Sequence, residues 1–149
     1  LNETVNEATV RYNYVTAFFA VIDKSTKMMR FSNAGHFPTI VYKERTNEFI
    51  ECASQGTALG LFYDMNIDID ESSIQLETGD RLILYTDGVL DCQNSKGDFF
   101  GKKLFYEFIS ENHSRPPVDF SEKLIDTLYE FTDSKPFIDD ITLLVFDVE

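Results

Sequence analysis

The residues in this sequence best suited to chemistry are acids that stand at the ends of apolar runs. Asp87 follows closely on the apolar run 82–85 and is itself followed by Gly88, while Asp139 and Asp140 stand just before the last apolar run of the chain. Carboxylate oxygens are the ligands that hard divalent cations prefer, and a rigid sheet holds such ligands in place. These acids are therefore candidate metal ligands, although an Asp-Gly pair after a strand is by itself more often a plain turn.

Other catalytic chemistries find little support in the sequence. The two cysteines, Cys52 and Cys92, and the two histidines, His36 and His113, lack the spacing of a zinc site. The sequence has no Gly-x-Ser-x-Gly nucleophile motif and no Gly-rich phosphate loop. Because isolated thiols suit a reducing compartment, we expect a cytoplasmic protein.

The length, composition and charge of the chain limit the classes of protein to which it can belong. The chain has 149 residues, of which 43% are hydrophobic, and this predicts a single globular domain over residues 1–149. A formal net charge of −13 opposes binding to nucleic acid, since like charges repel. No apolar run approaches the roughly 20 residues of a membrane span.

The elements that must position the acids follow from the apolar pattern. The run before Asp87 reads as a strand buried on both faces, and Gly88 is expected to allow a sharp turn with positive φ after it. Strands are predicted at residues 14–22, 27–32, 39–42, 48–52, 66–74, 81–86 and 141–148. Helices are predicted around residues 104–109 and from Pro116 to Phe131, where apolar residues recur at spacings of three and four. This order favours a β-rich α+β sandwich covered by helices.

Four segments in this order resemble one family. They are residues 14–23, Asn33-Ala-Gly-His36, residues 79–91 with Asn94 and Gly97 following, and Asp139-Asp-Ile-Thr142. Together they look like the metal-dependent protein phosphatases of the sporulation stage II protein E and RsbU type, which are relatives of the protein phosphatase 2C fold. The resemblance covers nearly the whole chain.

The resemblance implies a sandwich of two antiparallel β-sheets flanked by helices. It also implies two Mn²⁺ or Mg²⁺ ions and a water that bridges them and attacks a phosphoserine or phosphothreonine. Asp87 and Asp139 match the family's metal ligands and catalytic acids, and Gly88 is a further expected metal contact. Four other residues are expected around this first set of ligands: Asp140, His36, Asn33 and Thr86. For His36 a structural role is the stronger expectation.

One departure from the family pattern limits what this chain is expected to do alone. The Gly-Asp-x-x-Gly-His-Gly-like segment that carries the metal-bridging acid is missing before residue 14. Leu1 is not an initiator methionine, so we expect an N-terminally truncated piece, the C-terminal major part of the phosphatase domain. Such a piece is expected to be inactive and to bind at most one ion, weakly.

The resemblance also implies partners. The substrate is expected to be a phosphoprotein of the anti-sigma-factor antagonist type, and the parent chain is expected to carry an upstream sensor or regulatory domain that could tether it to a membrane. A homodimer is possible through an uncovered sheet edge. The alternative is a phosphatase-like module that binds a partner without catalysis. A simple calcium-binding domain ranks last, because no EF-hand loop is present.

Overall fold

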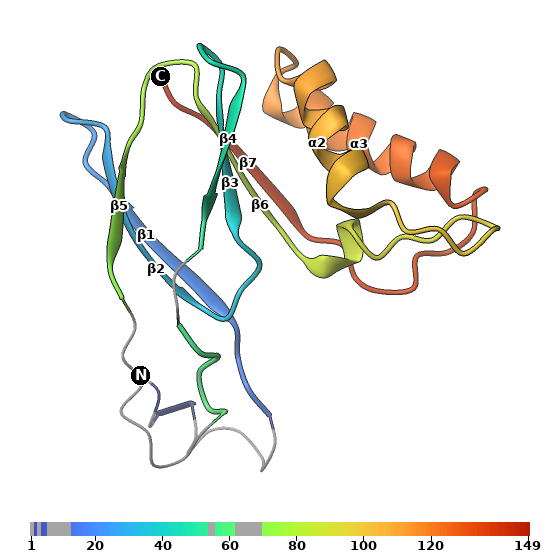
Figure 1. The fold of residues 1–149 in the computed structure, drawn as a ribbon, viewed down its shortest axis with the longest axis horizontal. Coiled ribbons are helices and arrows are strands. Elements are labelled where there is room, and N and C mark those ends of the chain that lie inside the picture. The colour runs from blue at the N-terminus through green and yellow to red at the C-terminus, as the bar shows by residue number, and fades with distance from the viewer. Residues whose placement is uncertain (1, 3, 6–12, 54–55, 62–69) are drawn as a thin grey trace. The chain divides into compact units, whose positions relative to one another are not determined.

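A computed structural model describes the chain in two compact units (Figure 1). The described residues are 2, 4–5, 13–53, 56–61 and 70–149. The first unit comprises Leu1–Thr39 and Glu51–Glu77, and the second comprises Ile40–Ile50 and Thr78–Glu149.

The first unit is built on a three-stranded antiparallel sheet in the order β1-β2-β5. Its strands are β1 (Ala17–Ile22), β2 (Met28–Ala34) and β5 (Ser72–Gln75). A tight turn at Asp23 joins β1 to β2, where the carboxylate accepts the Ser25 hydroxyl at 2.6 Å and the amides of Ser25 and Thr26. These hydrogen bonds favour the ionised form and lower the pKa of Asp23 to about 2.

The strands predicted at residues 14–22 and 27–32 are confirmed, with shifted boundaries. β1 begins at Ala17, three residues later than expected, and β2 continues to Ala34, two residues beyond the expected end. The strand predicted at 66–74 is confirmed only over its last part, because β5 begins at Ser72. Residues 66–69 of that prediction lie outside the described residues.

The second unit holds most of a four-stranded sheet in the order β4-β3-β6-β7. Its strands are β3 (Thr39–Lys43), β4 (Glu48–Cys52), β6 (Arg81–Tyr85) and β7 (Leu143–Asp147). Each strand was predicted, and β4 has the predicted bounds. β6 lies between β3 and β7 and pairs antiparallel with both, which is why Leu82, Ile83 and Tyr85 are buried.

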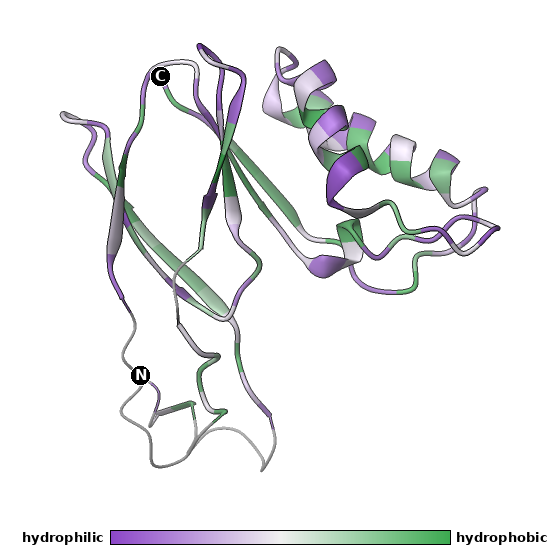
Figure 2. Cartoon of the chain, viewed as in Figure 1, coloured by the Kyte–Doolittle hydropathy of each residue, from purple (hydrophilic) through white to green (hydrophobic). Residues whose placement is uncertain are grey.

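Two helices, α2 (Gly101–Asn112) and α3 (Pro117–Phe131), pack on this sheet and on each other. The Phe105 ring of α2 meets Tyr85 of β6 at 4.9 Å between centroids, and Phe108 meets Phe120 of α3 at 5.1 Å. Both helices are amphipathic, as the hydropathy colouring in Figure 2 shows. Two antiparallel sheets with helices confirm the predicted α+β class. Within the described residues, no helix is long and apolar enough to cross a membrane.

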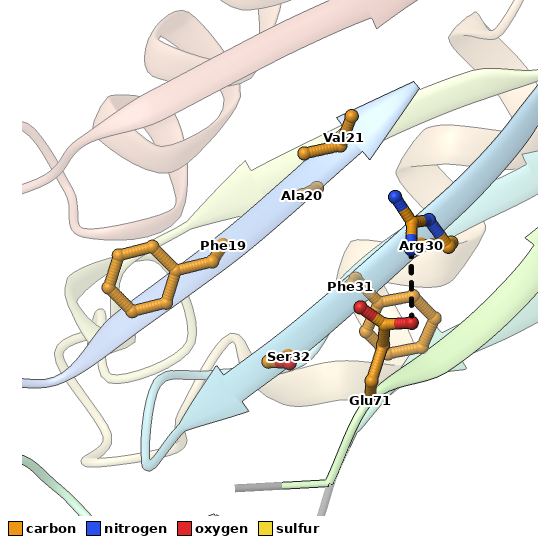
Figure 3. Close-up of a pocket in the computed structure, with 7 residues that line it drawn as sticks. All are labelled: Phe19, Ala20, Val21, Arg30, Phe31, Ser32 and Glu71. Atoms are coloured by element: carbon orange, nitrogen blue, oxygen red, sulfur yellow. Dashed lines mark hydrogen bonds and ion pairs between the residues drawn. The ribbon is translucent and has the colours of Figure 1, made fainter. Parts of the chain in front are cut away.

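Among the strands that the structure describes, β1 lies at the edge of the three-stranded sheet and exposes apolar side chains. Phe19 and Val21 lie on one face of the sheet, 45% and 64% exposed, and they help to line a shallow hollow (Figure 3). The polar residues of this hollow include Arg30 and Glu71, which form an exposed ion pair at 3.5 Å. β1 itself carries no charge and no proline, the features that commonly protect an edge strand from pairing with another chain.

We therefore expect this chain to self-associate through β1. Sedimentation velocity over a range of concentrations should show a dimer or larger species, and Val21→Lys should shift the population toward monomer because it places a charge beside the edge. Val118→Lys is the matched control, since Val118 of α3 is 66% exposed and lies in the other unit. Monomer alone at high concentration would count against the prediction.

Candidate functional site

The strand pair β6–β7 brings two acid-bearing segments to one end of the sheet. Tyr85, the last residue of β6, pairs with Leu143, the first residue of β7. Asp87 opens a short 3₁₀ turn (Asp87–Val89) just after β6, and Asp139 lies shortly before β7. Because the two strands are antiparallel, the end of one and the start of the other meet at the same edge (Figure 1).

The backbone segments that carry the acids are in direct contact. The Thr86 N–H donates to the Thr142 carbonyl at 3.1 Å, and the Thr86 hydroxyl donates to the Asp140 carbonyl at 3.0 Å. The residue before Asp87 is thus hydrogen-bonded to the residue after Asp139. The structure therefore brings five of the predicted site residues into one contact region: Thr86, Asp87, Gly88, Asp139 and Asp140.

Gly88 is required for a reason other than the predicted one. A turn does follow β6, but the φ of Gly88 does not lie in the left-handed region, so the expectation of a positive φ is wrong. A Cβ at this position would stand 2.5 Å from the Asp140 carbonyl oxygen and 3.0 Å from its carbon. The constraint is the close approach of the two segments, which leaves no room for a side chain.

Each candidate carboxylate is oriented by the next residue in the chain. Asp87 Oδ1 accepts the Gly88 N–H at 3.1 Å, and Asp139 Oδ1 accepts the Asp140 N–H at 2.7 Å. Asp87 is half-buried and Asp139 is exposed. Among the described residues, neither carboxylate forms an ion pair with a cationic side chain, so their negative charge is available to a cation.

The donor set fits part of a site for Mg²⁺ or Mn²⁺. Carboxylate oxygens and a main-chain carbonyl are hard ligands of the kind these ions take. The structure nevertheless holds no group of three or more His, Cys, Asp or Glu side chains that could bind a metal within the residues it describes. The acids Asp87 and Asp139 therefore supply ligands without completing a centre.

The segment Asn33–His36 belongs to the first unit, where its polar groups are engaged locally. The Asn33 side chain donates to the His36 carbonyl at 2.9 Å and accepts the His36 N–H at 2.7 Å, which closes the loop after β2. His36 Nδ1 lies 3.2 Å from the Thr16 hydroxyl. These contacts favour structural roles, and a place for Asn33 and His36 beside the acids stays a prediction.

Cys92 is a neighbour of the site that the sequence patterns did not single out. Its thiol donates to the Gly88 carbonyl at 3.2 Å, and burial, with a smaller effect of Asp91, raises the pKa of the thiol. The signal was the spacing, since a residue four positions on can reach the carbonyl of a helical turn. The neutral thiol helps to orient the carbonyl of Gly88, which has a second lone pair for another partner.

Comparison with known proteins shows which family and which individual proteins this chain is similar to. The sequence profile of the family described as Stage II sporulation protein E (SpoIIE) matches residues 1–149. Phosphoserine phosphatase RsbU of Bacillus subtilis is 27% identical over 145 residues, which are 97% of this chain and 42% of that protein. The chain thus spans less than half the length of this relative.

Solved structures show the same fold. The SiaA-PP2C domain of Pseudomonas aeruginosa superposes with a TM-score of 0.77 at 24% identity, over 90% of this chain and 52% of that one. The phosphatase domain of SpoIIE from Bacillus subtilis, in a Mn-presoaked form, gives a TM-score of 0.67 at 18% identity, over 90% of this chain and 56% of that one. At these identities the structures support the fold alone.

The close approach at Gly88 predicts a specific defect. Gly88→Ala forces the Asp140 segment away, so it should lower the free energy of unfolding by about 1–3 kcal/mol and also weaken Mn²⁺ binding. Gly97→Ala is the control: Gly97 has φ +85° but nothing within 4 Å of an added Cβ. It should lower stability, measured by urea unfolding, and leave Mn²⁺ affinity unchanged. Equal effects of both variants on affinity would contradict the account.

Proposed function

Because the chain belongs to the stage II sporulation protein E family, we propose that it is part of a metal-dependent phosphatase acting on phosphoserine or phosphothreonine in a protein. The match covers the whole chain, and the relative RsbU is described as a phosphoserine phosphatase. The observation that carries the proposal is the contact between the Asp87 and Asp139 segments at one end of the β6–β7 pair. This contact supports the proposal because it joins the backbone segments that carry the two family-matched acids.

The role proposed for each site residue follows from the chemistry of its carboxylate, carbonyl or amide group. The carboxylates of Asp87 and Asp139 would hold a divalent cation, with the carbonyl of Gly88 as a further oxygen ligand. Such ions, when bound, lower the pKa of water and neutralise the charge of a phosphoryl group. The Gly88 and Asp140 amides hold the carboxylates in fixed orientations before any cation arrives, which lowers the entropic cost of binding. No covalent nucleophile is needed.

The natural protein that contains this sequence is proposed to act in a cytoplasmic signalling pathway. Its substrate is proposed to be a phosphoprotein of the anti-sigma-factor antagonist type, following the resemblance to the RsbU type. The net charge of −13 makes nucleic acid an unsuitable partner. A sensor or regulatory domain upstream is part of the same proposal.

A second candidate is a phosphatase-like module that binds a partner without catalysis. It is favoured by one observation, the lack of a three-residue metal-binding group within the described residues. The first candidate predicts turnover of a phosphoprotein, whereas the second predicts binding to a partner without turnover.

A measurement of turnover therefore distinguishes the two candidate functions. The full-length natural protein should release phosphate from a phosphoserine peptide in the presence of Mn²⁺. Asp87→Asn or Asp139→Asn should lower kcat at least about 100-fold, because each removes a carboxylate that would hold the cation, and the cation is what neutralises the phosphoryl charge. Asp126→Asn, on the exposed face of α3, is the control and should behave as wild type. Phosphate release without metal, or release unaffected by Asp87→Asn, would contradict the phosphatase proposal; peptide binding without release would favour the binding module.

The acid pair also predicts how this chain alone binds metal. Calorimetric titration with Mn²⁺ should show at most one ion with a dissociation constant on the order of 10⁻⁴ to 10⁻³ M, as expected for a site with few charged ligands. Either Asp87→Asn or Asp139→Asn should remove the heat of binding. Two tightly bound ions, or binding that survives both substitutions, would place the metal site elsewhere.

A further inference from the structure

We infer that Thr86 is a positioning residue of the metal site, whose hydroxyl sets the spacing between Asp87 and Asp139. The inference rests on the proposed function, since it assigns a role toward the cation that the two acids would hold. Thr86 is not itself a ligand of the cation. It acts through the two segments that it joins.

The hydroxyl of Thr86 uses both of its hydrogen-bonding functions on the other segment. It donates to the Asp140 carbonyl at 3.0 Å and accepts the Thr142 N–H at 3.0 Å. A hydroxyl has one donor, so the first bond takes all of its donating capacity. The Thr86 N–H adds a third bond, to the Thr142 carbonyl at 3.1 Å.

These bonds reach a part of the chain that the sheet does not hold. The β6–β7 ladder ends at the pair Tyr85–Leu143, four residues after Asp139. The bonds of Thr86 continue the connection beyond the ladder, first to Thr142 and then to Asp140. Without the hydroxyl, the last hydrogen bond between the two segments among the described residues is the main-chain bond at Thr142. We therefore expect the position of Asp139 relative to Asp87 to be held less tightly.

The packing of Gly88 supports the same geometry. The Asp140 carbonyl oxygen that accepts the Thr86 hydroxyl is also the atom that an added Cβ on Gly88 would meet at 2.5 Å. The carbonyl thus accepts a hydrogen bond from Thr86 and lies close to the backbone of Gly88 in the 3₁₀ turn. Two independent contacts fix one atom, next to the metal-binding acid.

The competing explanation is that Thr86 merely ends a strand. That role would affect folding stability, whereas a positioning role affects metal affinity. The hydrogen bonds of Thr86 to the second segment are solvent-exposed, so water can replace the lost partners in the folded protein. Removing the hydroxyl should consequently change stability little and change the ligand geometry more.

Three substitutions isolate the hydroxyl. Thr86→Val keeps the shape and the β-branched character of the side chain but has no hydrogen-bonding group. Thr86→Ser keeps the hydroxyl. Thr127→Val is the matched control, because the Thr127 hydroxyl also donates to a backbone carbonyl, that of Lys123 at 2.8 Å, but does so within α3.

The test is the Mn²⁺ affinity of the full-length natural protein, measured by calorimetry, together with hydrogen exchange of the Thr142 amide in the metal-free protein. Thr86→Val should weaken Mn²⁺ binding about 10- to 100-fold, the usual effect of losing a partner that orients metal ligands. It should also speed exchange at Thr142, with little change in the unfolding midpoint. Thr86→Ser should restore affinity and protection, and Thr127→Val should have wild-type affinity.

Wild-type Mn²⁺ affinity in Thr86→Val, in a protein where Asp87→Asn and Asp139→Asn abolish binding, would overturn the inference and leave the proposed function standing. Unchanged binding in the two Asn variants would overturn the proposed function and the inference with it. If Thr86→Val does not fold, Thr86→Ala takes its place, and normal Mn²⁺ affinity in that variant overturns the inference equally.

Discussion

The antiparallel pairing of β6 with β7 is the constraint on which the candidate site depends. Asp87 and Asp139 lie 52 positions apart in the sequence, and only the register of these strands makes their segments neighbours. Leu82 and Ile83 are adjacent and both buried, so β6 is covered on both of its faces. The pairing of Arg81 with Asp147 and of Tyr85 with Leu143 gives the register, and this register decides where the acid-bearing segments meet.

Polar contacts reinforce this register at both ends of the strand pair. At the end away from the acids, the buried Arg81 guanidinium forms two hydrogen bonds with the carboxylate of its strand partner Asp147, at 2.6 and 2.8 Å. Its Nη2 also donates to the Arg115 carbonyl, and the group stacks over the Phe120 ring, which links β6 to α3 and the segment before it. At the end near the acids, the hydrogen bonds of Thr86 to Asp140 and Thr142 connect the two segments. The helices cover the sheet between these two ends. The acids therefore lie at a sheet end that is restrained by hydrogen bonds and by helix packing.

Much of this arrangement could be predicted from the sequence, because it follows from local patterns. The run at residues 82–85 indicated the central strand, and apolar spacings of three and four indicated α2 and α3. The reason for Gly88 could not be predicted, since the close approach of Asp140 is a contact between distant parts of the chain. The two bonds of the Thr86 hydroxyl were missed for the same reason. A pattern of residue types marks a strand end, but it does not show which backbone groups will face that end.

The central claim is that the two acid-bearing segments form one cation-binding location, and paramagnetic broadening by Mn²⁺ tests it most directly. In a ¹⁵N-labelled sample of this chain, small additions of Mn²⁺ should broaden the amide signals of Gly88 and Asp140 together and before those of residues outside the two acid-bearing segments, because broadening falls steeply with distance from the ion. Broadening that begins at acids elsewhere, such as Asp126 on α3, or that affects only one of the two segments, would contradict the claim.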